Sequence, residues 1–126
     1  MSLQIIAQQF YSAAIAQDWH AVELLISDTF YIEEAPGLPF GGIYEGLQGL
    51  KTLNKLVFRH FHRFNVYPNL YLEGERQVAV WIRAQGVGRK THCSFETEIC
   101  EWLEFSDQRI ASIKPFYFDE ALINTI

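Results

Sequence analysis

The chain has 126 residues, of which 49% are hydrophobic and 20% are charged, and its formal net charge is −5. These values predict one folded domain over residues 1–126 and argue against a disordered chain. The acidic balance argues against a nucleic-acid partner, because phosphate binding needs a concentrated basic face. No apolar stretch is long enough to cross a bilayer, so we expect no membrane partner.

Helical spacing of apolar residues predicts three helices. Residues 2–17 and 47–60 each carry such a pattern. A shorter helix is predicted over residues 19–26. Asp18 stands directly before it, where its carboxylate can accept hydrogen bonds from the free N–H groups of the first turn.

Residues 28–34 are predicted to form a strand that carries two carboxylates into a loop rich in proline and glycine. Phe30, Ile32 and Glu34 share one side of this strand, because side chains alternate between faces. Glu34 therefore ends an apolar row beside the loop, a position suited to the mouth of a pocket. The alternative is an ordinary solvated glutamate next to a turn.

The spacing of apolar residues changes to two after residue 63 and predicts an antiparallel meander of four strands. These strands fall at residues 64–73, 77–83, 90–105 and 109–119. Pro68 interrupts the first, which indicates an edge strand or a bulge. Three helices, one strand among them and a meander together predict an α+β fold.

The strand at residues 90–105 has two chemically different faces. Glu101 is the only charged member of an otherwise apolar row, which is predicted to face the core. Desolvation there would raise the pKa of Glu101 and keep it protonated near neutral pH. The alternatives are a buried structural glutamate tied to a backbone N–H or to a tyrosine, or a bulge that reverses the faces. Trp102 lies on the opposite row, and a homodimer through this face would cover it.

The only cysteines, Cys93 and Cys100, fall on opposite faces of this strand, so we expect them to stay unpaired. The N-terminus lacks the features of a secretory signal, and together these observations predict a cytoplasmic location. The sequence contains no CxxC or HExxH spacing, no P-loop and no GxGxxG or GxSxG pattern, so we expect no metal or other cofactor.

These elements in this order resemble a known family. The helix ending at Asp18, the SDTFYIEEAP strand, the LPFGGIYEG loop and the RIASIKPFYFD strand are similar to the SnoaL-like branch of the nuclear transport factor 2-like superfamily. The resemblance covers essentially the whole chain. It implies a cone: a bent, mostly antiparallel sheet around the first helix, a pocket inside, and dimers through the outer face of the sheet.

The resemblance also implies roles for individual residues. Relatives include ketosteroid isomerase, in which an Asp base works with an oxyanion hole made by a Tyr and a protonated Asp. Glu34 corresponds to the base and Glu101 to the protonated acid, whereas Phe10 occupies the tyrosine position. Tyr11 is expected to point about 100° away around the helix. Losing one oxyanion donor costs about a hundredfold in rate or more, which argues against steroid isomerisation.

The first functional hypothesis is therefore an acid/base isomerase, cyclase or dehydratase that acts on a hydrophobic carbonyl compound. Glu34 would remove a proton beside the carbonyl, and neutral Glu101 would donate to the developing oxyanion. His92 is an alternative acid or base if the pocket opens near the start of the long strand. The apolar residues predicted to line the pocket are Phe10, Phe30, Trp81, Phe95, Leu103 and Tyr117.

Two further hypotheses remain open from the sequence. A non-catalytic dimeric module could bind a hydrophobic small molecule or a protein, with its glutamates neutralised by salt bridges to Arg59, Arg63 or Lys114. Alternatively, a structural dimer could fill the cone with its own side chains, since the chain has 10 Phe and 6 Tyr.

Overall fold

The computed structural model describes all residues from 1 to 126. The elements in chain order are α1 Leu3–Ile15, α2 Trp19–Leu25, β1 Ile26–Glu34, β2 Gly42–Glu45, α3 Gly46–His60, β3 Phe61–Glu73, β4 Gln77–Gly88, β5 Ser94–Ser106, β6 Arg109–Tyr117 and α4 Glu120–Thr125. Helices come first and most strands later, so the predicted α+β class is confirmed.

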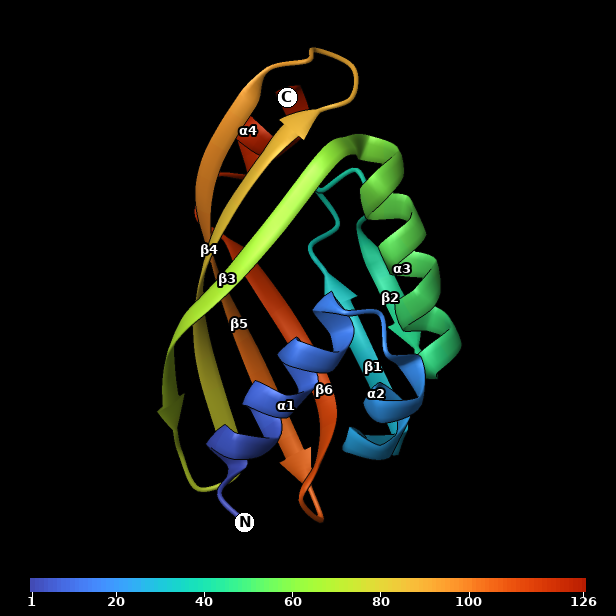
Figure 1. The fold of residues 1–126 in the computed structure, drawn as a ribbon, viewed down its shortest axis with the longest axis vertical. Helices are drawn as coiled ribbons and strands as arrows, with labels where there is room; N and C mark the ends of the chain where they lie inside the picture. Colours follow the sequence, from blue (N-terminus) through green and yellow to red (C-terminus); the bar gives the residue numbers. More distant parts are fainter.

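The six strands form one strongly curved sheet in the order β2-β1-β6-β5-β4-β3. β1 pairs with β6 in parallel, and all other neighbours are antiparallel. Figure 1 shows α1 and α3 on one side of the sheet, with α1 crossing in front of β5 and β6. This arrangement is the cone that the resemblance implied.

The helix starts follow the capping chemistry of the sequence. The hydroxyl of Ser2 accepts a hydrogen bond from the Ile5 N–H at 3.2 Å, and α1 begins directly after it. The Asp18 carboxylate accepts from the Ala21 N–H at 3.3 Å, which confirms its predicted role as the cap of α2.

The loop after β1 contains a strand that the sequence analysis missed. Gly42–Glu45 pairs antiparallel with β1, with Glu34 opposite Gly42 and Tyr31 opposite Glu45. Four residues are too few for an alternation of apolar and polar side chains to be recognised in the sequence. The segment becomes a strand because β1 offers it a pairing partner. The strand embedded among the helices is therefore a two-stranded unit, and α3 begins immediately after it at Gly46, whose φ is +66°.

Two predictions about strand irregularities can be checked directly. β3 is an edge strand, and its register with β4 shifts between Pro68 and Leu70, so both features inferred from Pro68 are confirmed. In β5 the pairing with β6 runs without a shift from Ile99 to Glu104. The predicted faces of β5 therefore hold through Glu101.

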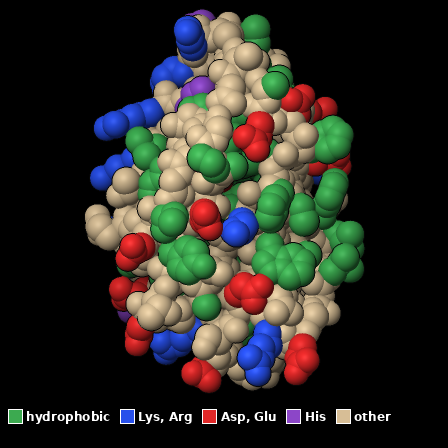
Figure 2. Space-filling model, turned by 180° about the vertical axis from the view of Figure 1, so that it is seen from behind, with side chains coloured by type: hydrophobic (Ala, Val, Ile, Leu, Met, Phe, Trp, Pro, Cys, Tyr) green, Lys and Arg blue, Asp and Glu red, His purple; other side chains and the backbone are tan.

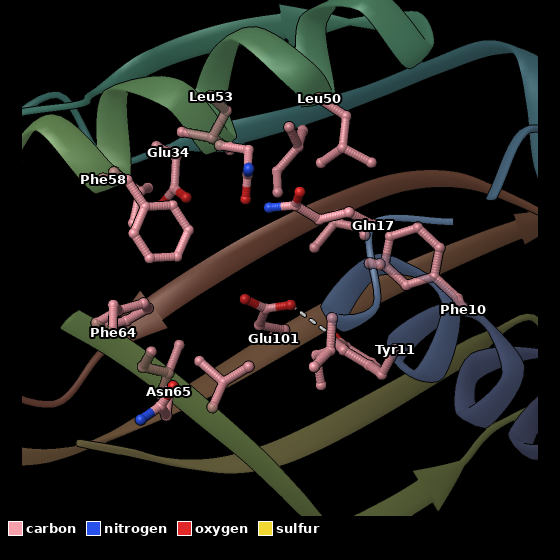
Figure 3. Close-up of a pocket in the computed structure, with 18 of the residues that line it drawn as sticks. Phe10, Tyr11, Gln17, Glu34, Leu50, Leu53, Phe58, Phe64, Asn65 and Glu101 are labelled. Atoms are coloured by element: carbon pink, nitrogen blue, oxygen red, sulfur yellow. Dashed lines mark hydrogen bonds between the residues drawn. The ribbon is translucent and has the colours of Figure 1, made fainter. Parts of the chain in front are cut away.

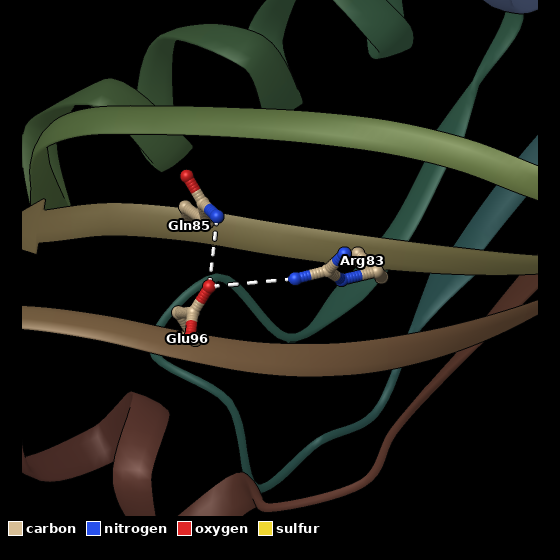
Figure 4. A network of polar contacts seen from close by, with 3 residues as sticks. All are labelled: Arg83, Gln85 and Glu96. Carbon is tan, nitrogen blue, oxygen red and sulfur yellow. Dashed lines mark hydrogen bonds and ion pairs between the residues drawn. The ribbon is translucent and has the colours of Figure 1, made fainter.

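The outer face of the sheet carries exposed aromatic side chains on three neighbouring strands. Trp81 on β4, Trp102 on β5 and Phe116 on β6 are all exposed. Figure 2 shows the molecule from this side, with large hydrophobic groups among acidic and basic ones. Nearby, Glu96 accepts a hydrogen bond from Gln85 at 2.8 Å and pairs with Arg83 at 3.6 Å (Figure 4).

Cys93 is exposed and lies directly before β5 rather than in it, Cys100 is half-buried, and both thiols are free. None of the four helices combines the length and the apolar character that a membrane-spanning helix requires.

Candidate functional site

A pocket lies inside the cone between α1, α3 and the sheet (Figure 3). Its volume is about 360 Å³, and 15 of its 20 lining residues are hydrophobic. The side chains of Gln17, Phe58 and Asn65 are exposed and belong to this lining, which places them where the pocket meets solvent. The structure therefore contradicts the hypothesis of a cone filled by its own side chains.

Glu34 enters this pocket from the end of β1. Its neighbours Phe30 and Ile32 on the same side of the strand are buried, so the predicted alternation carries a carboxylate into the interior. Glu34 is only 5% exposed, and its Oε1 has no hydrogen-bond partner. Desolvation, with a smaller contribution from the charge of Glu101, raises the pKa of Glu34 to about 9.

Glu101 enters the same pocket from the middle of β5. The phenol of Tyr11 donates a hydrogen bond to its Oε1 at 2.6 Å (Figure 3). Desolvation raises the pKa of Glu101 to about 7, whereas the hydrogen bond from Tyr11 acts in the opposite direction by stabilising the carboxylate. Both carboxyl groups singled out in the sequence therefore face one apolar pocket.

Tyr11 lines the pocket although it follows Phe10 directly on α1. Both Phe10 and Tyr11 are buried and line the pocket. The rings of Phe10 and Phe30 lie 6.5 Å apart on the side of β1, and those of Tyr11 and Tyr71 lie 6.3 Å apart on the side of β3. Because the curved sheet encloses α1 from two directions, its buried face is wider than one stripe. A phenol from α1 is thus present in the pocket, and it donates its hydrogen bond to Glu101.

Tyr117, at the end of β6, also lines the pocket as predicted. Desolvation first, and then the charges of Glu34 and Glu101, raise the pKa of Tyr117 well above its ordinary value. Its phenol is therefore neutral at physiological pH and lies close enough to both carboxyl groups to feel their charge. It can donate a hydrogen bond to a ligand between them.

The other predicted lining residues lie elsewhere. Phe30, Phe95 and Leu103 are buried in the core but do not border the pocket, because neighbouring side chains fill the space around them. Trp81 is 37% exposed on the outer face, where its indole N–H donates to Glu98 at 2.9 Å. The alternation along β4 places Val80 and Ile82 inside instead, so the predicted lining role of Trp81 is wrong.

No salt bridge neutralises either pocket glutamate, which removes the pairing expected for a non-catalytic module. Lys114, one of the three proposed partners, lies 3.5 Å from Glu33, the neighbour of Glu34 on the outer side of β1. His92 is exposed in the turn before β5 and does not line the pocket. No cluster of three or more His, Cys, Asp or Glu side chains that could hold a metal forms in the structure.

The amide residues of the pocket were not predicted from the sequence. Gln17, Asn54 and Asn65 line it, from the end of α1, from α3 and from β3. Single amides on helices and edge strands carry no periodic signal, so only the folded arrangement brings them together.

The sequence pattern of the SnoaL-like domain matches residues 7–113, which is most of the chain. The chain belongs to the SnoaL-like domain family. This match includes Tyr11, Glu34 and Glu101, whose side chains all line the pocket. No curated protein has a significantly similar sequence.

Solved structures with the same fold share little sequence with this SnoaL-like domain. A nuclear transport factor 2-like protein of unknown function from Burkholderia pseudomallei aligns over 100% of both chains, with a TM-score of 0.87 and 16% identity. TerC, crystallised with polyporic acid, aligns over 95% of this chain and 93% of its own, with a TM-score of 0.84 and 12% identity. A protein with a ketosteroid isomerase-like fold from Catenulispora acidiphila, in complex with trimethylamine, aligns over 95% and 91%, with a TM-score of 0.76 and 12% identity. At these identities the likeness shows the fold.

Proposed function

We propose that this SnoaL-like domain is an acid/base enzyme that moves a proton beside the carbonyl group of a hydrophobic small molecule, as an isomerase, cyclase or dehydratase. The observation that carries the proposal is the meeting of Glu34 and Glu101 in one apolar pocket without a cation. Groups with strongly shifted pKa values in a pocket are typical of acid/base sites.

The surroundings of the two carboxyl groups favour a division of roles opposite to the one predicted from the sequence. Glu101 has a hydrogen-bond donor, Tyr11, that stabilises its charged form, whereas Glu34 has no donor at its buried Oε1. Glu101 therefore ionises first, and its charge then holds the proton on Glu34. Near neutral pH, Glu101 is the general base and neutral Glu34 is the hydrogen-bond donor.

The proposed chemical step uses only these side chains. The Glu101 carboxylate takes a proton from the carbon next to the substrate carbonyl, and the C–H electron pair moves toward the carbonyl oxygen. Glu34 and the phenol of Tyr117 donate hydrogen bonds to the oxygen as its negative charge grows. The enolate then takes the proton back from Glu101 at another carbon, expels a hydroxyl group that takes this proton and leaves as water, or attacks a second carbonyl whose oxygen takes the proton, which gives isomerisation, dehydration or cyclisation respectively.

The pocket also supports the substrate class. A volume of about 360 Å³ with mostly hydrophobic lining fits a compact apolar molecule of one to a few rings. Polyporic acid and trimethylamine, the ligands found with two structural neighbours, support small-molecule binding in this fold.

We further propose a homodimer through the outer sheet face. Trp81, Trp102 and Phe116 form an exposed aromatic patch there, and aromatic residues are enriched at the centres of such interfaces. Hydrogen bonds from the indoles to Glu98 and Glu104 orient the two tryptophans on the surface. The free thiols of Cys93 and Cys100 support the predicted cytoplasmic location.

The direct test is deuterium exchange, because it detects proton removal whatever the product. The protein is incubated in D₂O with a panel of hydrophobic ketones, such as tetralone, and the loss of the α-proton NMR signal is followed. We expect exchange with the wild type and a rate lower by about a hundredfold or more with Glu101→Gln. Glu98→Gln, which removes a carboxylate from the outer face of the same strand, is the matched control and should exchange like the wild type.

Exchange that persists unchanged in Glu101→Gln would contradict the proposed role of this residue. Absence of exchange across the panel would contradict the proposed reaction, and tight ketone binding without exchange would support a non-catalytic ligand-binding module.

A further inference from the structure

Gln17 adopts a backbone conformation that its residue type disfavours. Its φ is +57°, in the left-handed region that glycine adopts without steric cost. It lies directly after α1, and the Asp18 N–H reaches back to the Ala13 carbonyl at 2.9 Å, which is the hydrogen bond of a glycine-type helix end. Glycine would adopt this conformation at a lower steric cost, so we ask what the glutamine side chain does at this position.

The side chain of Gln17 points into the pocket. Figure 3 shows it extending from the end of α1 toward the space between Glu34 and Glu101. The hydrogen bond drawn among these residues joins Tyr11 to Glu101, and none reaches Gln17. Because α1 stops at Ile15, the left-handed residue is the point at which the chain turns over the pocket. The strained conformation therefore places a free amide at the pocket mouth.

A second amide lines the same pocket. Asn54 belongs to α3, one residue after the buried Leu53, and it is half-buried. Gln17 and Asn54 each offer two N–H donors and one carbonyl acceptor. Such groups recognise a neutral oxygen function, whereas the apolar lining around them recognises a ring or chain.

We propose that Gln17 is a specificity-determining residue that, with Asn54, binds a second oxygen function of the substrate. The substrate is then an oxygenated ring compound. Its reacting carbonyl lies beside the carboxyl groups of Glu34 and Glu101, and a hydroxyl or second carbonyl lies beside the amides of Gln17 and Asn54. This inference rests on the proposed function, which sets where the reacting carbonyl binds. Gln17 takes no part in the proton transfer.

Two naphthols test the inference, because an aromatic hydroxyl imitates the enol of the reaction. β-Naphthol carries one hydroxyl, and a dihydroxynaphthalene carries a second one on the far ring. Their dissociation constants are measured by calorimetry for the wild type, Gln17→Gly and Gln108→Gly. Gln108 is the matched control, since it is also a left-handed glutamine, with φ +61°, but is exposed in the β5–β6 turn and outside the pocket.

We expect the wild type to bind the diol about fivefold more tightly than β-naphthol, the effect of one neutral hydrogen bond. Gln17→Gly should lose this preference while binding β-naphthol like the wild type. Gln108→Gly should keep the preference. Both variants should unfold at the wild-type temperature or above it, because glycine relieves the left-handed backbone.

Three results would overturn the inference. If the wild type binds both naphthols equally, the second oxygen is not recognised. If Gln17→Gly keeps the preference for the diol, another group provides the recognition. If neither naphthol binds to the wild type, the inference fails together with the placement of the carbonyl in the proposed function. Binding of both naphthols without dependence on Gln17 contradicts this inference alone.

Discussion

Replacing Glu34 by glutamine should stabilise the protein, and the gain should grow with pH. In the folded chain burial raises the pKa of Glu34 to about 9, compared with an ordinary value of 4.5. Between these values the unfolded chain releases a proton that the folded chain keeps. The free energy of unfolding therefore falls as pH rises, by about 1.4 kcal/mol per pH unit. The contribution of Glu34 to the free energy of unfolding is fully present below pH 4.5, and it is lost progressively as the pH rises to about 9.

From about pH 5 to pH 8 this effect amounts to about 4 kcal/mol. Glutamine cannot ionise, so the stability of Glu34→Gln relative to the wild type should increase by that amount over the range. Burying the glutamine amide shifts the stability of the variant by the same amount at every pH. It therefore does not affect the comparison of how the two stabilities change with pH. Urea unfolding at several pH values, followed by the fluorescence of the three tryptophans, measures it.

Glu33→Gln is the matched control, because Glu33 lies on the same strand but faces solvent beside Lys114. It should keep the pH dependence of the wild type. If Glu34→Gln also keeps that dependence, Glu34 ionises in the folded protein as easily as in the unfolded one. The proposed neutral donor would then not exist.

Three further predictions concern other parts of the molecule. Tyr11→Phe removes the hydrogen bond that lowers the pKa of Glu101. The acid limb of the pH–rate profile for deuterium exchange should therefore move to higher pH by about one unit, and an unmoved limb would contradict the role of Tyr11. Phe61→Ala should lower the free energy of unfolding in urea by about 3–5 kcal/mol, because Phe61 is fully buried against Phe64 and Phe95. Phe118→Ala is the control and should change this free energy little, because Phe118 is 79% exposed. Trp102→Lys should convert the proposed dimer to a monomer, as measured by analytical ultracentrifugation, whereas Leu24→Lys on the exposed side of α2 should leave the dimer intact. A monomeric wild type would refute the proposed interface.

The sequence predicted the helices, most strands and both pocket glutamates because these depend on local rules. The alternation of side chains along β1 determines which face of the strand carries Glu34. The same alternation holds at Glu101, because the register of β5 with β6 has no shift there. Pro68 similarly indicated the edge strand and the register shift in β3. These predictions needed only the spacing of residues within one element.

The failures have different causes. Tyr11 was not expected to replace the tyrosine at the Phe10 position because it points about 100° away around the helix, whereas the curved sheet encloses α1 from two directions. Trp81 was placed inside because one β4 residue was assigned to the wrong side of the alternation. The left-handed turn that aims Gln17 at the pocket cannot be recognised in a sequence, because glutamine carries no signal for that conformation.

The central claim is that Glu34 and Glu101 hold one proton between them near neutral pH. Carbon-13 NMR of the glutamate side-chain carboxyls across a pH titration tests it directly, with signals assigned through Glu34→Gln and Glu101→Gln. We expect Glu101 to titrate with a pKa of about 7 and Glu34 with a pKa of about 9. Titration of both carboxyl groups close to 4.5, together with the exposed glutamates, would contradict the acid/base pair and the function built on it.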